Sequence, residues 1–398
     1  MILASVNWSN IGQSTLSAFF GVDAIVYAVA AIGLNVQFGY TGLLNFGQAG
    51  FMACGAYGLG MTAHYFQVSF WWGIVFGLVY AIGLGLIMGV PTLRLRADYL
   101  AIVTIALAEV VRLIVRSVKF KGLFGGSDGI NEFSAAYRSL TPFTSGVDYP
   151  LSIFDASPVQ IILMLLACGV VAAAIGRGVG RWLNRKAPSL GANAAWAIAS
   201  VVILVILLLA STQVVFKSYT MWTVTVGWCV VAVLALFVYM LMRSPWGRVL
   251  KAIREDEDAV RSLGKNVYSY KMQALILGGV IATFAGMLLS VDRGSVQPDN
   301  YSRDVTFYVL TALVLGGAAK VSGSIVGPML FWGLLQFINV FLNEVVTNNG
   351  GKLWILIESP NEIGPVRFMV VGLMLILLMV FRPQGLFGNR KEMALDGR

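Results

Sequence analysis

The sequence is poor in charge, in histidine and in cysteine. Only 12% of its 398 residues are charged, whereas 58% are hydrophobic and the mean hydropathy is +0.79. Such a composition cannot cover a water-soluble domain with polar surface, so it predicts a polytopic membrane protein. His64 is the single histidine, and the three cysteines, Cys54, Cys168 and Cys229, lie in apolar stretches. We therefore expect buried thiols rather than a disulfide framework, and no zinc site.

Features of a nucleotide site or an active site are also missing. The glycine-rich stretch GLFGGSDGI, residues 122–130, is not followed by a lysine-serine or lysine-threonine pair at phosphate-loop spacing. No nucleophile with a base and no paired carboxylates stand out, so we expect no catalytic residue, cofactor or metal. The net charge of +9 comes from basic residues in short loops beside apolar runs. This placement predicts membrane orientation rather than nucleic-acid binding.

Apolar segments follow one another along the chain. Crossing a bilayer takes roughly 20 residues, and nine runs are long enough: 18–37, 70–92, 97–117, 158–176, 193–212, 219–242, 270–291, 325–346 and 366–382. Two more, 43–66 and 305–319, are glycine-rich or short and are predicted to be broken or re-entrant. We expect an all-α polytopic membrane protein of about 11 membrane segments in a single transmembrane domain, residues 1–398.

Basic residues orient these segments. No Lys or Arg precedes Asp23, whereas the tail after Arg382 is basic, so we expect the N-terminus outside and the C-terminus inside. Segment 118–157 is then an extracytoplasmic loop and 243–269 a cytoplasmic one. One group of basic residues departs from the positive-inside rule because it lies at the outer end of a span: Arg112, Arg116, Lys119 and Lys121.

The segment SPWGRVLKAIREDEDAVRSLG, residues 244–264, is charged and helix-forming although apolar spans flank it. Ser244 is a good N-cap, Pro245 suits the first helical position, and Gly264 suits the left-handed residue that follows a helix. We expect one helix over 245–263. Its apolar residues recur every three or four positions and form a stripe: Trp246, Val249, Leu250, Ile253, Val260 and Leu263. Such a segment is either a solvated loop that sets topology or a lever that docks on a partner.

Polar side chains gather in NVQFGYTGLLNFGQAGF, residues 35–51. This composition suits a broken helix that lines a solute path, and its free N–H groups would suit a substrate carboxylate. The alternative is that the polar side chains join helices to one another. The candidate path residues are Asn35, Gln37, Thr41, Gly42, Asn45 and Gln48. Elsewhere, Glu109 and Arg112 are three residues apart and are predicted to pair on one helix.

Five blocks, in this order, resemble the permease subunits of branched-chain amino acid ABC importers, specifically the M-type subunit. They are GYTGLLNFGQAGF (39–51), LRLRADYLAIVTIALAEVVRL (93–113), GGSDGI (125–130), GRVLKAIREDEDAVRSLG (247–264) and FRPQGLFG (381–388). The fourth block looks like the coupling loop that docks on the ATPase, with Asp258 where the family pattern has Glu. The resemblance implies coupling roles for Arg254, Glu257, Asp258, Ala259 and Gly264.

The resemblance also implies partners. These are a second homologous permease subunit, two cytoplasmic ATPases, an extracytoplasmic solute-binding protein and membrane lipid, in the plasma membrane of a prokaryote. The same architecture serves urea and amide importers, so the solute stays open. A secondary transporter or channel is a further alternative, as is a membrane scaffold or sensor, although the sequence lacks the ion site or the soluble domain that those would favour.

Overall fold

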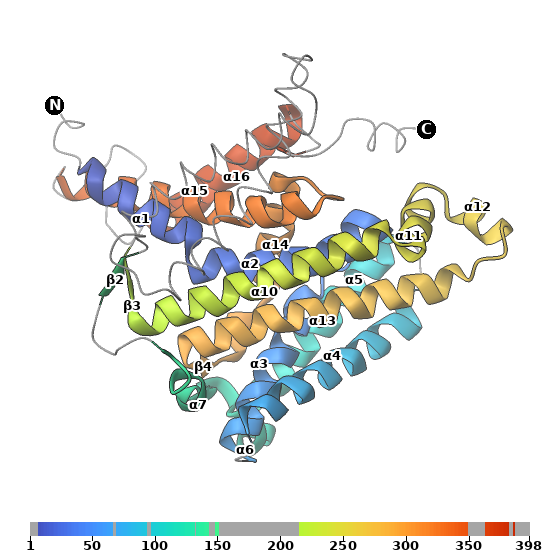
Figure 1. Ribbon diagram of the computed structural model, residues 1–398, viewed down its shortest axis with the longest axis horizontal. Helices are drawn as coiled ribbons and strands as arrows, with labels where there is room; N and C mark the ends of the chain where they lie inside the picture. Colours follow the sequence, from blue (N-terminus) through green and yellow to red (C-terminus); the bar gives the residue numbers. More distant parts are fainter. Residues whose placement is uncertain are drawn as a thin grey trace.

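A computed structural model describes residues 7–66, 69–93, 97–131, 133–142, 148–150, 215–348, 363–381 and 385–386 (Figure 1). The helices are α1 (Trp8–Phe20), α2 (Val22–Leu34), η2 (Asn35–Tyr40), α3 (Gln48–His64), α4 (Phe70–Thr92), α5 (Ala97–Arg116), η3 (Val118–Phe120), α6 (Lys121–Phe124), η4 (Gly126–Asp128), α7 (Ala135–Arg138), α10 (Ser218–Arg243), α11 (Pro245–Glu255), α12 (Glu257–Ser262), α13 (Val267–Arg293), η6 (Pro298–Tyr301), α14 (Arg303–Gly316), α15 (Val321–Asn348) and α16 (Ile363–Phe381). The predicted spans 158–176 and 193–212 lie outside these residues.

Long apolar helices dominate the described part of the chain, as expected for a helical membrane protein with several spans. Five stretches within it are long and apolar enough to cross a bilayer: Trp8–Tyr40, Phe70–Thr92, Thr220–Arg243, Val267–Arg293 and Val321–Thr347. The predicted span 70–92 coincides with α4, and the predicted spans 219–242 and 270–291 lie inside α10 and α13. Hydropathy therefore located these helices to within a few residues.

The first predicted span, 18–37, begins differently. Its first three residues belong to a separate helix, α1, and the chain turns at Gly21, where φ is −71° and ψ is 175°, before α2 begins. The indole nitrogen of Trp228 donates a 3.2 Å hydrogen bond to the carbonyl of Phe20, which the turn leaves without its helical partner. The sequence did not signal this turn, because apolar residues continue on both sides of it.

Two segments predicted to be broken or re-entrant contain short helices. In the first, residues 42–47 are irregular and α3 begins only at Gln48. In the second, α14 has 14 residues, about 21 Å of helix at 1.5 Å per residue, whereas the hydrocarbon core is about 30 Å thick. Neither segment is one uninterrupted span.

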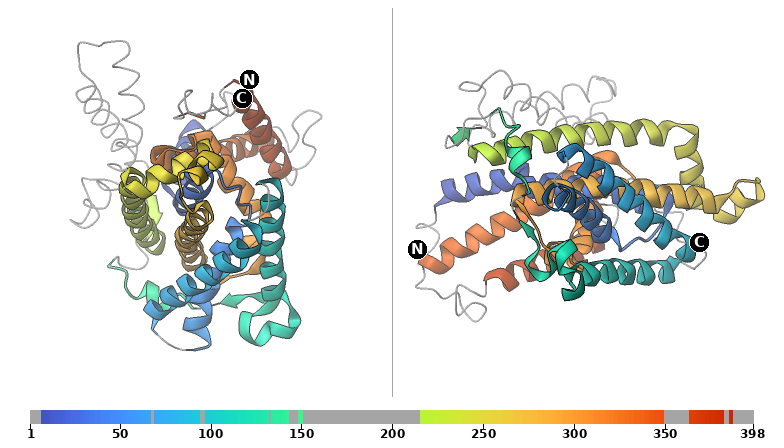
Figure 2. Two further views of the ribbon diagram at one scale, coloured as in Figure 1. Left: turned by 90° about the vertical axis from the view of Figure 1, so that its right-hand side faces the viewer. Right: turned by 90° about the horizontal axis from the view of Figure 1, so that it is seen from below.

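Helix α13 lies at the centre of the bundle, beside α2 and α3, with α10 and α4 on its flanks (Figures 1 and 2). Glycines allow the close approach. A Cβ on Gly278 would stand 2.5 Å from the carbonyl oxygen of Gly33, and one on Gly286 would overlap the carbonyl oxygen of Met52. Helices in membranes pack through such small residues because the hydrophobic effect contributes little to helix association in lipid, so close van der Waals contact has to stabilise it.

Short strands join the loops at one end of the bundle. Strand β1 (Ile130–Asn131) pairs antiparallel with β4 (Ser295–Val296), and β2 (Asp148–Pro150) pairs with β3 (Val215–Lys217). The all-α prediction thus describes the long elements and omits these strands, which are too short to show a period of two. Helices α6 and α7 lie at this end, whereas α11 and α12 project at the opposite end (Figure 1).

Candidate functional site

The segment that follows α2 departs from regular helix. Residues Asn35–Tyr40 form a π-helical segment, η2, and Gly42 has φ +75°, in the left-handed region. The hydroxyl of Thr41 donates a 2.8 Å hydrogen bond to the carbonyl of Val36, five residues back. π-Helical turns are rare and occur often at functional sites. The break predicted from the amides and glycines is therefore present, and η2 leads into it.

Three amide side chains of this segment meet in the protein interior. Gln37 and Gln48 are fully buried and Asn45 is 2% exposed. The Asn45 amide donates to the side-chain oxygens of Gln37, at 2.9 Å, and of Gln48, at 3.4 Å. Gln37 donates to the carbonyl of Leu275 at 2.8 Å, and Gln48 donates to that of Ala30 at 3.2 Å. This amide cluster (Gln37, Asn45 and Gln48) ties the broken segment to α2 and α13.

Asn35 links the two breaks in the chain. Its side-chain oxygen accepts a 2.8 Å hydrogen bond from the N–H of Ala319, and its amide donates to the carbonyl of Lys320 at 3.1 Å. Ala319 has φ +63°, which is unusual for a residue other than glycine. Asn35 thus holds the turn between α14 and α15 against η2. The sequence did not assign this role, because the two segments lie 284 residues apart.

Several N–H groups at the N-terminus of α3 have acceptors within the protein. The N–H of Phe46 donates to the hydroxyl of Thr104 at 3.1 Å, and that of Ala49 donates to the hydroxyl of Thr306 at 2.9 Å. The N–H of Gly47 donates to the side-chain oxygen of Asn45 at 2.8 Å. These backbone N–H groups, which were expected to donate to a substrate carboxylate, therefore donate to protein acceptors in this conformation. Thr104 and Thr306, two fully buried threonines, were missed, and their only sequence signal is a hydroxyl within an apolar run.

The charged segment 244–264 contains two helices, so the prediction of one helix over 245–263 was wrong. Ser244 caps α11 as predicted, through the N–H of Gly247. At Asp256 the backbone is extended, with φ −154° and ψ 103°, and its carboxylate accepts a 2.9 Å hydrogen bond from the N–H of Ala259 at the start of α12. An aspartate followed by two further acids is a favourable N-cap and first turn, and this signal in REDEDA was overlooked.

The apolar stripe of this segment is buried only in part. Leu250, Ile253 and Val260 are buried, whereas Leu263, at the end of the predicted stripe, is 78% exposed. Asp258 and Ala259 are also exposed. Glu257 pairs with Arg261 at 3.0 Å and with Lys271. Gly264 has φ +76°, as the expected C-terminal glycine should.

Arg254 joins α11 to the broken segment. Its guanidinium donates a 2.6 Å hydrogen bond to the carbonyl of Gly39 in η2. Its side chain also packs on Gly42, where a Cβ would stand 3.4 Å from the Arg254 Cγ. One turn earlier, the Lys251 ammonium lies 5.7 Å from the ring centroid of Tyr40. The projecting loop is therefore in direct contact with the segment that carries the amide cluster.

A second charged group lies at the other end of the bundle. Glu109 and Arg112 form the predicted pair on α5, at 2.5 Å. Arg112 also contacts Asp299 of η6 at 2.7 Å, and Arg116 contacts the same carboxylate at 3.3 Å. Among the described residues no cluster of histidine, cysteine and carboxylate side chains could hold a metal ion.

Long apolar helices, two broken segments around buried amides and a projecting charged loop in contact with them are features expected of a membrane permease. The family described as branched-chain amino acid transport system / permease component matches residues 17–380, and the chain belongs to this family. The resemblance inferred from the five sequence blocks is therefore confirmed. No solved structure matches the chain.

Individual relatives support the same assignment. The chain is 28% identical over 373 residues to the high-affinity branched-chain amino acid transport system permease protein LivM of Escherichia coli, covering 91% of this chain and 68% of the relative. It is 23% identical over 411 residues to the probable branched-chain amino acid transport permease protein LivM of Methanocaldococcus jannaschii, covering 95% and 93%. A shorter match, 35% identical over 107 residues, links 26% of the chain to 29% of the fructose import permease protein FrcC of Rhizobium meliloti.

Proposed function

We propose that this chain is the permease subunit of an ATP-binding-cassette importer that moves branched-chain or other hydrophobic amino acids across the plasma membrane of a prokaryote. Family membership and the names of the relatives support the transport class and the solute. The observation that carries the mechanism is the hydrogen bond from Arg254 to the carbonyl of Gly39. Through it, a push on the charged loop reaches a broken membrane helix without an intermediate element.

In this mechanism α11, α12 and Gly264 form the coupling element of the cytoplasmic loop 243–269. Glu257 is held by Arg261 and Lys271, while Asp258, Ala259 and Leu263 lie at the exposed tip. The ATPase would seat this tip, and its closure would displace α11 together with Arg254.

The solute path of the proposal runs past Asn35, Gln37, Thr41, Gly42, Asn45 and Gln48. The polar side chains among them are buried and bond to one another or to backbone in the present conformation, whereas Gly42 is exposed. Displacement of η2 would separate the amides and free the N–H groups at the start of α3. A substrate carboxylate would then replace the hydroxyls of Thr104 and Thr306 as the acceptor at this helix N-terminus.

The proposal requires other chains. Two ATPases bind and hydrolyse ATP, a second homologous permease completes the path, and an extracytoplasmic protein delivers the solute on the side of loop 118–157. The whole chain acts as one permease domain with its N-terminus outside and its C-terminus inside. The matches to permease proteins support a transport role rather than an enzymatic one.

Uptake of labelled solutes tests the function. A strain that lacks its own leucine and urea uptake systems is supplied with this chain and the components encoded beside its gene, and labelled leucine and urea are offered separately. Leucine accumulation that requires both the ATPases and this chain supports the proposal. Accumulation of urea alone would mean that the solute is urea and not an amino acid. Leucine uptake without any ATPase would identify a secondary transporter or channel.

Gly264→Val is expected to loosen the ATPases more than it unfolds the permease. A β-branched residue at φ +76° costs on the order of 1 kcal/mol or more. The strain is confined to the backbone, because no atom lies within 4 Å of the position that a Cβ would take. Co-purification of the ATPases and hydrolysis stimulated by the binding protein measure the effect. Gly264→Asn is the matched control, since asparagine tolerates the left-handed region; full docking by the valine variant would contradict a coupling role for this turn.

Asn45→Leu is expected to reduce uptake several-fold and to lower the stability of the permease by about 2 kcal/mol, because it leaves the Gln37 oxygen and the Gly47 N–H buried without their partners. Labelled-leucine uptake and thermal unfolding in detergent are measured together. Asn343→Leu, on the exposed side of α15, is the control. A variant of lowered Tm whose uptake per folded complex is normal would assign Asn45 to helix joining alone.

A further inference from the structure

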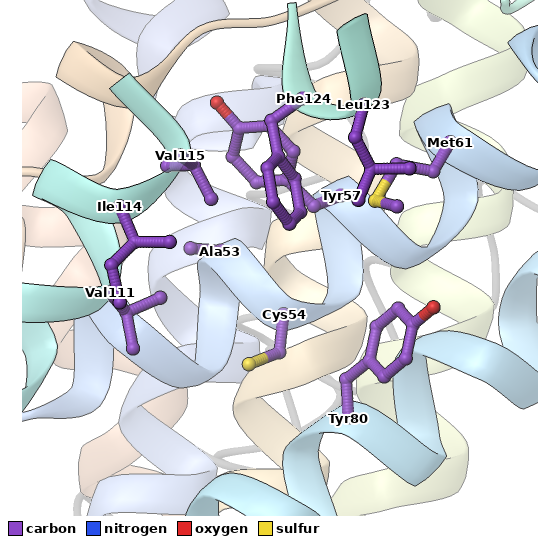
Figure 3. A pocket seen from close by; sticks show the side chains of 10 residues that line it. All are labelled: Ala53, Cys54, Tyr57, Met61, Tyr80, Val111, Ile114, Val115, Leu123 and Phe124. Carbon is purple, nitrogen blue, oxygen red and sulfur yellow. The ribbon is translucent and has the colours of Figure 1, made fainter. Parts of the chain in front are cut away.

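An apolar pocket of about 310 Å³ lies between α3, α4, α5 and α6, apart from the amide cluster (Figure 3). This volume is at the lower end of the range for small-ligand sites. The pocket is lined by Ala53, Cys54, Tyr57, Met61, Tyr80, Val111, Ile114, Val115, Leu123 and Phe124. Its only polar side-chain groups are one thiol and two phenolic hydroxyls, so the wall fits a hydrocarbon chain rather than a charged or strongly polar solute.

One of these polar groups lacks a partner. Tyr57 is 3% exposed, and its hydroxyl makes no hydrogen bond to any described residue. Its ring packs edge-on against Phe124, with 5.9 Å between the ring centroids, and its hydroxyl points to the Val115 side of the pocket (Figure 3). A buried hydroxyl nearly always has a partner. A ligand that is hydrocarbon apart from an ester oxygen would supply one.

The pocket adjoins apolar surface on two membrane helices. On α4, Phe76, Val79 and Tyr80 are exposed, and on α5 Val110 and Ile114 are exposed. Tyr80 and Ile114 belong both to this surface and to the lining of the pocket. An acyl chain of the surrounding bilayer could therefore enter between α4 and α5 without crossing a polar barrier.

Beyond the pocket, residues 116–124 (RSVKFKGLF) alternate basic and apolar side chains. Val118 is 84% exposed, and Phe120 and Leu123 are also exposed. Exposed apolar side chains between basic ones are typical of segments that lie in the headgroup region, where long basic side chains reach the phosphates. This basic segment (116–124) contains three of the four residues that depart from the positive-inside rule.

The charges of the basic segment are unequally neutralised. Lys121 pairs with Asp128 at 2.7 Å, and this pairing lowers the pKa of Asp128 and raises the pKa of Lys121. Arg116 and Arg112 both pair with Asp299. Lys119 is exposed, and no carboxylate in the described part of the chain forms an ion pair with it. An anionic group above the pocket would therefore find one unpaired cation and a second, half-exposed one.

We propose that this pocket and the basic segment together form a specific site for an anionic membrane phospholipid, with one acyl chain in the pocket and the phosphate beside Lys119 and Arg116. The acyl ester accepts a hydrogen bond from Tyr57. The departure from the positive-inside rule then has a function, because the basic residues bind lipid at this end of the bundle. Lipid binding at this site does not depend on the solute or on the ATPases. It can therefore be tested independently of the proposed transport function.

Native mass spectrometry of the purified full-length permease tests the site, with phosphatidylglycerol and phosphatidylcholine of identical acyl chains as competing probes. The wild type is expected to retain phosphatidylglycerol preferentially. Lys119→Gln should reduce this preference about fivefold, the equivalent of roughly 1 kcal/mol per basic residue near a charged membrane surface. Lys265→Gln, in the exposed loop after Gly264, is the charge control and should leave the preference unchanged.

A second pair of variants tests the pocket. Ile114→Trp fills its mouth at an exposed position and should abolish retention of the lipid, whereas Leu236→Trp, on the exposed face of α10, should not. Thermal unfolding of all variants checks that they fold. Equal retention of the two lipids by the wild type, or full retention by a folded Ile114→Trp variant, overturns the proposal. Displacement of the lipid by free leucine also overturns it, because the pocket would then belong to the solute path.

Discussion

Arg254→Met is expected to reduce leucine uptake on the order of tenfold to a hundredfold while the ATPases stay bound. A hydrogen bond from a charged donor is worth about 1.5–3 kcal/mol, and here it joins α11 to η2 beside the weaker contact of Lys251 with the Tyr40 ring. Methionine retains most of the side-chain length and removes the donor. Uptake in proteoliposomes, normalised to hydrolysis stimulated by the binding protein, measures how far transport is uncoupled from ATP.

Arg261→Met is the matched control in the same loop. Arg261 pairs only with Glu257 and Asp258 among the described residues, both in α12, and its side chain is 63% exposed. Exposed pairs of this kind are worth little, so this variant should keep near-normal coupling. If both variants transport equally well, or if Arg254→Met loses the ATPases altogether, the contact to Gly39 is not the transmission point.

The difference between Arg254 and its neighbours shows what the sequence could and could not predict. The sequence marked the loop, its N-cap at Ser244 and its glycine turn, because caps and turns depend on local residues. It could not distinguish Arg254 from the other basic residues of the loop, since the acceptor is 215 residues away. A hydrogen bond to a distant carbonyl leaves no local pattern.

The amide-rich segment was likewise predictable in its location but not in its long-range contacts. Glycines and amides predicted a broken helix within residues 35–51, and a π-helical turn and an irregular stretch are present there. Which amide contacts which helix was not predictable, because Gln37 reaches Leu275 and Asn35 reaches the turn after α14. Composition therefore identified the place, and only the packing of α2 against α13 reveals the contacts.

Gly278→Val is expected to abolish folding of the permease or to lower its Tm more than any other variant considered. A Cβ at this position would stand 2.5 Å from the carbonyl oxygen of Gly33 and 2.6 Å from the Gln37 Cγ. Overpacking of a core usually costs about 1–3 kcal/mol, and here the cost should reach or exceed the upper end because the obstacle includes backbone. Moving α13 away would also weaken the hydrogen bond from Gln37 to Leu275. Thermal unfolding in detergent measures the loss.

Gly83→Val is the matched control. Gly83 lies within α4, and nothing stands within 4 Å of the position that its Cβ would occupy. Valine has a somewhat better helix propensity than glycine, so the Tm of this variant should be unchanged or slightly raised. A similar loss of stability in both variants would mean that glycine-to-valine changes harm these helices for reasons other than the approach of α13 to α2.

The valine variant can lose stability because its Cβ clashes with backbone or because its side chain is too large. Gly278→Ala distinguishes these two causes. If the clash at the Cβ itself is responsible, alanine should already lower the Tm by most of the amount that valine does, because the first carbon meets the Gly33 carbonyl in both. If side-chain volume is responsible, alanine should be nearly neutral. We expect the first result, since two helix backbones in contact leave no room for even one methyl group. A neutral alanine variant would instead mean that α2 and α13 can separate by the width of a methyl group without disturbing Gln37.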